Sequence, residues 1–515
     1  MVHNASGCFP IAVAVVALIL AALNDGGTTT AGGHSRLSNL ASHSSTALAT
    51  RAYSATSTPT FTASPSSVVA PASSTPVTTP SASVRVTVDL SAPEAVSRFS
   101  TGVTYTQFSL DSWGDAAAVA RGRMLLASST RYQNQQMMGW GVSNPEPSPG
   151  VYDWSSLDRR LQLMRDTGAI PVITFCCAPG WMRPHGYQDD WAYLETAPDP
   201  AHVQDFADLA RAVAIRYPDV KYFQVWNELK GMWGTAPGCT PWVCGQNRWD
   251  YERYTTLYNA VYDAVKSARP DAQFGGPYVV VATFSSRDQS KPSSVSGPYG
   301  VLDQRPLDVI RYWLAHKRGA DFITIDGKTK PADGVWASNE FTAGEYFVDV
   351  HNWLRSLDDS RYPGARTLPL WWAEWYASSP QDWRDLDHYN AVMASALAYT
   401  VRSGASVALI WKPQGDAQGF AHPEGIWTDS SLADGGQATP FYHTLKALND
   451  FWGPGVPIYR VVSSEPAKVV GIATQAKTML INKTTESLAV YLNGQAPITL
   501  GAYSVVVLDT PGPSR

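Results

Sequence analysis

The sequence predicts an α/β fold, a (β/α)8 TIM barrel followed by a small antiparallel β-sandwich domain. Short, nearly continuous apolar runs alternate with amphipathic helical patterns from about residue 100 to 450. Such runs are typical of parallel strands that are buried on both faces. After Pro457 the helical pattern stops, and short strands separated by turn residues follow.

We expect eight barrel strands, because eight strand–helix units fit the length of this part of the chain. The candidate strands begin near Phe99, Arg123, Ile170, Lys221, Gln273, Asp321, Leu368 and Ser406. Between them, Ser155–Thr167 and Tyr251–Ala268 carry apolar residues three and four positions apart, which predicts amphipathic helices. An open doubly wound sheet is the alternative, but the chain has no G-x-G-x-x-G turn.

The tail is expected to form the β domain. Its candidate strands are Val469–Ile472, Thr478–Asn482, Leu488–Leu492 and Val505–Leu508. The alternating segment Val84–Leu90 has no obvious place in the barrel, so we expect it to pair with this domain. The resulting division is 1–23 (signal peptide or anchor), 24–83 (linker), 84–98 (strand segment), 99–453 (barrel) and 454–515 (β domain).

The first eighty residues are expected to lie outside the fold. Phe9–Leu23 is an apolar run that suits a secretion signal better than a membrane span, with an uncleaved anchor as the alternative. From Ala52 to Ser83 the chain is rich in Ser, Thr, Ala and Pro and carries no charge. This composition is typical of a disordered stalk, either a tether to a cell wall or membrane or an inert tail. We therefore expect a secreted or cell-surface protein.

Composition and missing motifs exclude several classes of function. The net charge is -5, and no run of Lys and Arg is present, which argues against nucleic-acid binding. Five Cys residues in 515 are too few for a disulfide-framework protein. The chain has neither the G-x-S-x-G of a serine hydrolase nor the H-E-x-x-H of a zinc protease.

Two glutamates follow apolar strands of the predicted barrel. Glu228 comes directly after Lys221–Trp226, and Glu374 comes after Leu368–Trp372. Active sites of TIM barrels lie at the carboxyl ends of the strands, where these two side chains would face each other. Either glutamate alone is more often a cap or an ion-pair partner. Together they form the pair that glycoside hydrolysis needs, one acid and one carboxylate.

Three segments carry a resemblance to a known family: Gly150–Met182 (GVYDWSSLDRRLQLMRDTGAIPVITFCCAPGWM), Phe223–Leu229 (FQVWNEL) and Trp371–Ser379 (WWAEWYASS). From about Gly102 to Pro413 the chain resembles the retaining glycoside hydrolases of clan A. It is most similar to family 39, which includes β-xylosidases and α-L-iduronidases.

The resemblance implies that Glu228 is the acid/base and Glu374 the nucleophile. It also implies that Asn227 hydrogen-bonds the sugar 2-hydroxyl and that Trp411 forms the floor of the central subsite. An apolar setting should raise the pKa of Glu228, whereas donors should surround an ionised Glu374. Their carboxyl groups should lie about 5–5.5 Å apart.

Two strand ends depart from the family pattern, which usually has a histidine at each. Strand 2 is expected to end around Arg131, and strand 6 reads Asp326-Gly-Lys328, so Arg131 and Asp326 are candidates to contact the substrate. Lys328 is a candidate to bind a substrate carboxylate, as a lysine does in iduronidase-like members, with a solvated loop lysine as the alternative. β-Xylosidase activity is therefore not assumed, and a uronic acid, an arabinose-type sugar or a cell-wall glycan is expected.

Further candidates follow other strand ends. Tyr376, Trp181, Trp233 and Trp242 are candidates to contact sugar rings, or else to pack in loops.

The cysteines give two expectations. Cys239 and Cys244 flank a short loop and are expected to form a disulfide in an exported protein. Cys176 and Cys177 are expected to be buried thiols, with a vicinal disulfide as the alternative. No metal or organic cofactor is expected.

The sequence thus predicts an exported retaining glycosidase that acts on an oligo- or polysaccharide. A carbohydrate-binding barrel without catalysis and a transglycosylase that uses the same glutamate pair remain the alternatives.

Overall fold

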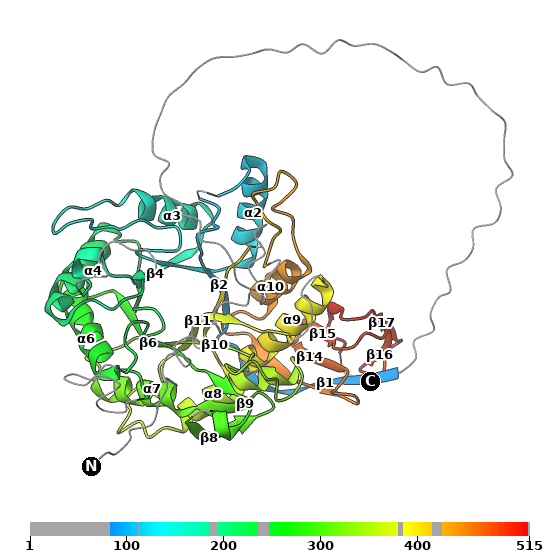
Figure 1. Ribbon diagram of the computed structural model, residues 1–515. Coiled ribbons are helices and arrows are strands. Elements are labelled where there is room, and N and C mark those ends of the chain that lie inside the picture. Colours follow the sequence, from blue (N-terminus) through cyan, green and yellow to red (C-terminus); the bar gives the residue numbers. More distant parts are fainter. Residues whose placement is uncertain are drawn as a thin grey trace, which may run out of the picture. The chain divides into compact units, whose positions relative to one another are not determined.

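The closed barrel predicted from the sequence is present (Figure 1). The structure is a computed structural model that describes residues 83–111, 113–184, 193–234, 247–289, 291–379, 385–414 and 425–512. The expected signal segment and linker lie outside these residues, as do Cys239, Trp242 and Cys244. In the described part of the chain, no helix is long and apolar enough to cross a membrane.

Eight parallel strands close the barrel in chain order. They are β2 (Ser100–Thr104), β3 (Tyr132–Gln136), β4 (Ile170–Phe175), β5 (Tyr222–Val225), β6 (Gln273–Val280), β10 (Phe322–Lys328), β11 (Leu370–Tyr376) and β12 (Val407–Trp411). β12 pairs with β2 from Val407–Ser100 to Trp411–Thr104, which completes the ring.

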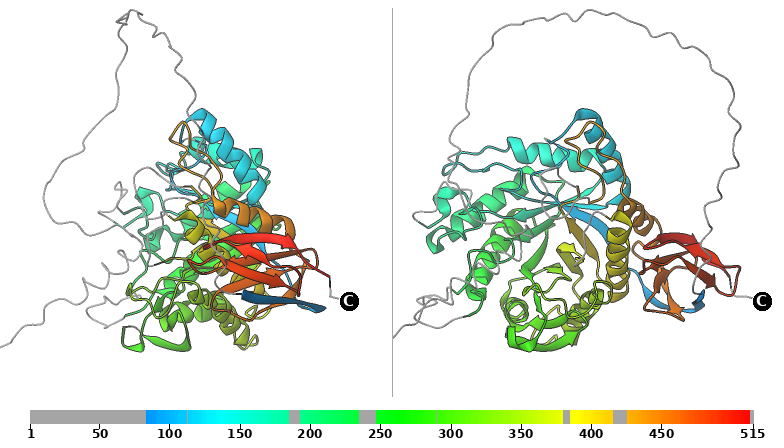
Figure 2. Two further views of the ribbon diagram at one scale, coloured as in Figure 1. Left: turned by 90° about the vertical axis from the view of Figure 1, so that its right-hand side faces the viewer. Right: turned by 45° about the vertical axis from the view of Figure 1, so that its right-hand side comes forward.

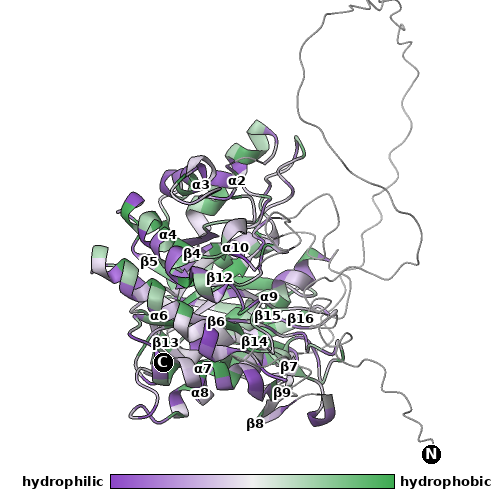
Figure 3. Ribbon diagram, turned by 60° about the vertical axis from the view of Figure 1, so that its left-hand side comes forward, coloured by the Kyte–Doolittle hydropathy of each residue, from purple (hydrophilic) through white to green (hydrophobic). Residues whose placement is uncertain are grey.

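Helices link the strands and cover the outside of the barrel (Figures 1 and 2). The described helices are α2 (Ala116–Ser129), α3 (Ser155–Asp166), α4 (Val203–Arg216), α6 (Tyr251–Ala268), α7 (Gln304–His316), α8 (Glu345–Ser356), α9 (Leu386–Ser403) and α10 (Pro440–Phe451). The expected amphipathic helices therefore appear as α3 and α6. In Figure 3 polar and apolar residues alternate along such helices, and in α6 Leu257, Val261 and Val265 are buried.

The sequence predicted that the second barrel strand begins near Arg123. In the structure this strand begins at Tyr132. The residues around Arg123 belong to helix α2, whose first turn is capped by the Asp115 carboxylate accepting from Ala117 N and Ala118 N. The strand itself, β3, has the sequence YQNQQ. Its last four residues are buried although they are polar, so no apolar run marks it.

The barrel interior is layered. At its lower end Tyr132, Tyr222, Phe322 and Trp371 pack ring against ring, with 4.2 Å between the centroids of Phe322 and Trp371. Above them lies a hydrogen-bonded polar layer contributed by successive strands. Asn134 Nδ2 donates to Thr104 Oγ1, Thr174 Oγ1 to Asn134 Oδ1, Gln224 Nε2 to Thr174 Oγ1, and Thr324 Oγ1 to Gln224 Oε1. Layered side chains of this kind fill TIM barrels.

The C-terminal residues, together with the N-terminal strand β1, form a seven-stranded sheet in the order β17-β16-β1-β13-β14-β15-β18 (Figure 2). The strands are β1 (Ser83–Val96), β13 (Pro457–Ser463), β14 (Val469–Ala473), β15 (Lys477–Asn482), β16 (Leu488–Leu492), β17 (Ile498–Leu500) and β18 (Val505–Asp509). The N-terminal strand β1 pairs with β13 and β16. Arg402 of α9 donates to Gly471 O of this sheet at 2.6 Å.

A small sheet, which no pattern in the sequence predicted, is inserted between β6 and α7. Its three strands are β7 (Thr283–Phe284), β8 (Pro292–Gly297) and β9 (Gly300–Asp303), in the order β7-β9-β8. β7 follows two residues after the carboxyl end of β6, so this sheet stands at the mouth of the barrel.

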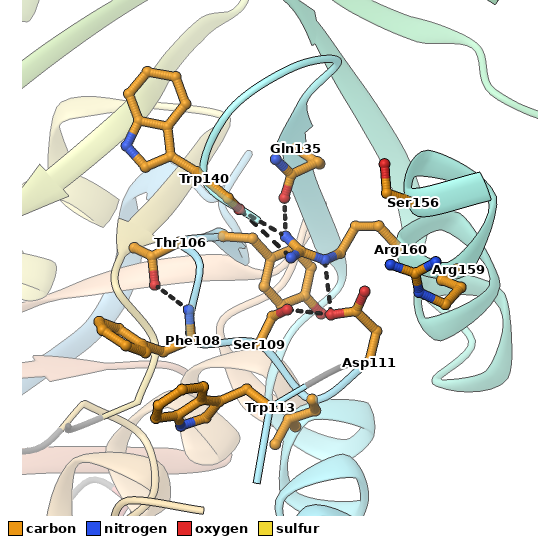
Figure 4. Close-up of polar contacts among 12 residues, drawn as sticks. Thr106, Phe108, Ser109, Asp111, Trp113, Gln135, Trp140, Ser156, Arg159 and Arg160 are labelled. Carbon is orange, nitrogen blue, oxygen red and sulfur yellow. Dashed lines mark hydrogen bonds and ion pairs between the residues drawn. The ribbon is translucent and has the colours of Figure 1, made fainter. Parts of the chain in front are cut away.

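A buried arginine fixes the loop after β3 (Figure 4). Arg160 of α3 is fully buried and pairs with Asp111 at 3.1 Å, while its guanidinium lies 4.9 Å from the centre of the Tyr105 ring. It also donates to the Gln135 side chain and to Trp140 O. The loop that carries Trp140 is thereby held against the barrel.

We predict that Arg160→Met lowers the free energy of unfolding by about 3–5 kcal/mol, because it leaves Asp111 buried without its cation. Arg165→Met is the matched control. Its pair with Asp219 is partly exposed, so a loss below about 1 kcal/mol is expected. Urea unfolding measures both, and equal losses would contradict the prediction.

Candidate active site

A cavity of about 280 Å³ opens at the carboxyl ends of the barrel strands. We call it the acidic cavity. It is lined by Trp140, Glu195, Asn227, Glu228, Lys230, Val280, Asp326, Gly327, Lys328, Glu374, Tyr376 and Trp411. This is the end of a TIM barrel at which active sites are built.

Three carboxyl groups meet in this cavity. Carboxyl oxygens of Glu228, Asp326 and Glu374 all lie within 4.8 Å of one another. Asp326 and Glu374 come from neighbouring strands, β10 and β11, and are paired in register. Glu228 follows β5. The two glutamates that the sequence singled out therefore face each other across one mouth.

The chain bends sharply where β5 ends. Trp226, Glu228 and Leu229 have φ angles of 65°, 50° and 52°, a left-handed conformation that residues with side chains rarely adopt. The bend is held by Trp226 N donating to Phe175 O at 3.0 Å and by Trp226 Nε1 donating to Lys230 O at 2.8 Å. Such strain is concentrated at functional sites, where the surrounding structure maintains it. Here the strained segment carries both Glu228 and Lys230, which line the acidic cavity.

Glu374 accepts hydrogen bonds from side chains of two strands and donates one, from its backbone, to a third strand. Tyr278 OH of β6 donates to Glu374 Oε1 at 2.9 Å, and Gln136 Nε2 of β3 donates to the same atom at 3.3 Å. The backbone N–H of Glu374 donates to Asp326 Oδ1 at 2.6 Å. These contacts fix the carboxyl group at the centre of the cavity.

A lysine supplies positive charge beside Glu228. Lys230 Nζ lies 3.0 Å from Glu228 Oε2 and 2.6 Å from Glu195 Oε1. Glu195 also accepts from Asn227 Nδ2 at 3.0 Å. Burial by itself lowers the pKa of Lys230, but the charges of Glu228 and Glu195 outweigh it and leave the pKa raised. Lys230 is therefore a permanent cation.

The pKa values of two of these carboxyl groups, Asp326 and Glu374, are raised above their usual values. Burial, followed by the charges of Glu374 and Glu228, raises the pKa of Asp326 well above its usual value. Burial and the charge of Glu228 raise the pKa of Glu374 to about 8, although Lys230 and Tyr278 act to lower it. An ionised Glu374, as the sequence predicts for the nucleophile, therefore has to form against this upward shift of its pKa. The expected donors are present, but burial and the neighbouring carboxylate outweigh them.

Two buried acceptors border the site without a hydrogen-bond partner among the described residues. They are Gln136 Oε1 and Asn227 Oδ1. Buried polar atoms are rarely left unpaired, so a ligand with several hydroxyl groups suits this place.

Most of the predicted site residues come together here. Asn227, Asp326, Lys328, Tyr376 and Trp411 line the acidic cavity with the two glutamates. The side chains that the sequence analysis missed are Gln136, Trp140, Glu195, Lys230 and Tyr278.

Three of the predicted residues that the structure describes do not line the acidic cavity: Arg131, Trp181 and Trp233, the last of which lines a second cavity. Arg131 is exposed and precedes β3, so it lies at the opposite end of the barrel from the cavity. The misplaced strand 2 caused this error. Trp181 is not among the residues that line the cavity, and its Nε1 donates to Glu146 O at 3.0 Å. It also lies edge-on to His202, with 5.5 Å between the ring centres.

Cys176 and Cys177, directly after β4, are fully buried, and their sulfur atoms lie 2.17 Å apart as in a vicinal disulfide.

The fold and the site define a TIM barrel with an acidic centre at its carboxyl end. Similar solved structures include a conserved exported protein from Bacteroides fragilis, with 12% identity and a TM-score of 0.58 over 82% of this chain and 100% of that one. A monomeric beta-xylosidase from Caulobacter crescentus has 17% identity and a TM-score of 0.52 over 79% of this chain and 83% of that one.

A third neighbour is a family 30 subfamily 8 xylanase from Clostridium acetobutylicum, with 13% identity and a TM-score of 0.50 over 82% of this chain and 98% of that one. The predicted resemblance to clan A is thus confirmed at the level of the fold. No family model and no curated protein sequence matches the chain.

The raised pKa of Asp326 predicts a pH-dependent stability. The folded state keeps a proton that the unfolded chain releases near pH 4, so the free energy of unfolding should fall as the pH rises above about 4. Asp326→Asn removes this penalty and keeps an acceptor for Glu374 N. We expect it to stabilise the protein by more than about 1 kcal/mol at pH 8 and by much less at pH 4. Urea unfolding at both pH values measures the difference, and a pH-independent difference would contradict the prediction.

Proposed function

We propose that this protein is a retaining glycoside hydrolase in which Glu228 is the acid/base and Glu374 the nucleophile. One observation carries the proposal: oxygens of the two side chains lie within 4.8 Å of each other in a cavity at the carboxyl end of a TIM barrel. That separation suits a retaining enzyme, whose carboxyl groups are about 5–5.5 Å apart, and not an inverting one, which needs about 6.5–9.5 Å. Two of the structural neighbours are described as a beta-xylosidase and a xylanase.

In the first step, an oxygen of Glu374 attacks the anomeric carbon while Glu228 gives its proton to the leaving oxygen. The glycosidic bond breaks, an ester bond to Glu374 forms, and the leaving group departs as a neutral alcohol. Tyr278 and Gln136 hold the attacking carboxylate in place through their hydrogen bonds to Oε1.

In the second step, Glu228 takes a proton from water, and the resulting hydroxide displaces Glu374 from the anomeric carbon. The sugar leaves with its original configuration after two inversions. The net reaction consumes one water, and both carboxyl groups return to their starting states. No metal or organic cofactor takes part in these steps.

The reactive form has its proton on Glu228 and its charge on Glu374. Moving one proton from Glu374 to Glu228 leaves the net charge of the cavity unchanged. Lys230 contacts Glu228 at 3.0 Å and also acts to lower the pKa of Glu374, so it stabilises the negative charge at either position. Asp326, which keeps its own proton, limits the charge that the cavity must hold.

The sugar is held by the remaining lining residues. Trp411 and Tyr376 lie with their ring centres 6.4 Å apart and supply aromatic surface. The unpaired Oδ1 of Asn227 is available to accept from a sugar hydroxyl. Lys328 adds a cation, which favours a substrate that carries a carboxylate. We propose an exported enzyme that acts on an oligo- or polysaccharide that carries carboxylate groups.

We predict that Glu374→Ala and Glu228→Ala each lose at least about 10²-fold in kcat. Azide should restore turnover in both, because it replaces the missing group. The glycosyl azide formed should have inverted configuration with Glu374→Ala and retained configuration with Glu228→Ala. Proton NMR of the products, and of the first-formed anomer from the wild type, distinguishes these outcomes. Asp288→Ala, in the short turn Arg287–Gln289, is a control that should behave as the wild type.

The same assays separate the alternatives. A barrel that only binds carbohydrate would show sugar binding without turnover on any glycoside, which would contradict the proposal. A transglycosylase would release more transfer product than hydrolysis product at low acceptor concentration. An inverted first product would contradict the assignment of Glu374 as nucleophile.

We further predict that Lys230→Met moves the acidic limb of the pH profile of kcat/KM to higher pH. Lys230 lowers the pKa of Glu374, so its removal should raise that pKa and delay formation of the nucleophilic carboxylate. Lys446→Met is the control, because Lys446 forms an exposed pair with Asp450. An unchanged acidic limb in Lys230→Met would contradict the prediction.

A further inference from the structure

A second cavity adjoins the acidic one. Its volume is about 130 Å³, and we call it the apolar cavity. Its wall is mostly apolar and comes from the segment after β5, the end of β6, the inserted sheet, the start of α7, and the end of β10 with the segment after it. The apolar lining residues that matter here are Trp233, Trp249, Val281, Ala282, Phe284 and Pro306.

On one side of the apolar cavity, aromatic rings pack against one another and against an arginine. Trp233 and Trp249 meet edge to face, with 4.7 Å between their ring centres. The guanidinium of Arg305 lies 5.3 Å from the centre of the Trp233 ring and 6.0 Å from that of Phe284. The aromatic side chains are only half-buried, so they offer their surface to the cavity.

The two cavities share one wall. Glu228, Lys230, Val280 and Lys328 line both of them. Glu374, in contrast, lines the acidic cavity and not the apolar one. A sugar placed between Glu228 and Glu374 therefore directs its leaving oxygen past Glu228, toward the apolar cavity.

We infer that the apolar cavity is the subsite of the leaving group and that it takes a flat apolar ring, such as an aromatic alcohol, and not a second sugar. This inference rests on the proposed function. It places an aromatic glycoside, or a sugar chain that ends in an aromatic group, among the substrates.

The exposed wall of the apolar cavity is mostly apolar, which favours a ring over a sugar, although six charged residues also line it: Glu228, Lys230, Asp303, Arg305, Lys328 and Lys330. Each buried sugar hydroxyl needs a partner, and leaving one unpaired is costly. Arg305 is already engaged, since its Nε donates to Asp303 Oδ2 at 2.8 Å and its Nη1 to Asn247 Oδ1 at 2.7 Å. Thr283 is 1% exposed, and its Oγ1 has no hydrogen-bond partner in the described part of the chain. One polar atom on an otherwise apolar ring suits this lining.

The test compares leaving groups on one sugar. A panel of glycosyl fluorides first identifies that sugar, because fluoride leaves without filling the apolar cavity. The 2-phenylethyl and ethyl glycosides of this sugar are then compared, since both release unactivated primary alcohols. We expect kcat/KM for the 2-phenylethyl glycoside to be at least about tenfold higher, as burial of a phenyl ring implies.

Variants locate the effect. Phe284→Ala and Trp249→Ala should reduce the ratio of the two kcat/KM values to less than about threefold, because the ring loses its contact surface. Tyr152→Ala, which truncates an exposed aromatic residue elsewhere, should keep the wild-type ratio. A ratio near one in the wild type would contradict the inference, and so would a disaccharide of the same sugar that reacts faster than the 2-phenylethyl glycoside.

The wild-type ratio needs no variant, so poor folding of Phe284→Ala leaves the test intact. Turnover of a glycosyl fluoride with no preference for the 2-phenylethyl group contradicts the leaving-group assignment alone. Absence of turnover with every fluoride contradicts the proposed function as well.

Discussion

The main physical constraint on this site is that three carboxyl groups lie within 4.8 Å of one another. Like charges at that distance in a buried site cannot all be present, so at least one group must keep its proton. Asp326, the most deeply buried of the three, is the natural holder of that proton, and Lys230 balances the remaining charge. The residues around the cavity follow from this requirement: donors point at Glu374, and a cation lies beside Glu228.

The layers beneath the cavity support this arrangement. A plug of packed rings closes the lower end of the barrel, and the polar layer above it links successive strands by hydrogen bonds. Thr104 Oγ1 of this layer also donates to Ala373 O, next to Glu374, at 2.6 Å. Polar side chains inside a barrel are costly unless they satisfy one another, which this layer does. The strand that carries Glu374 is thereby tied to the barrel directly below the site.

The sequence predicted the parts of this fold that have a local signature. Apolar runs marked most of the strands, and the polar residue after each run pointed to Glu228 and Glu374. Strand β3 was misplaced because its buried side chains are Gln and Asn, which hydrogen-bond to side chains of other elements, as Asn134 does to Thr104 of β2. Tyr278 and Gln136 were missed for a related reason. Their role comes from strands that are neighbours of Glu374 in space but distant in the chain.

Lys230 shows that even a residue next to Glu228 in the chain could not be assigned to the site from the sequence. It stands only two residues from Glu228, and in a regular strand that spacing would place both side chains on one face. The segment is not a strand, however. Trp226, Glu228 and Leu229 all adopt left-handed conformations, and this bend brings Lys230 Nζ to 3.0 Å from Glu228 Oε2. No propensity favours three such residues in a row of four, so the bend has to be imposed by tertiary contacts, of which the Trp226 hydrogen bonds are the clearest.

The same bend separates the two cavities, because Glu228 lies on the wall between them. A single strained turn therefore sets the charge balance of the acidic cavity and, in the proposed reaction, the direction in which the leaving group departs.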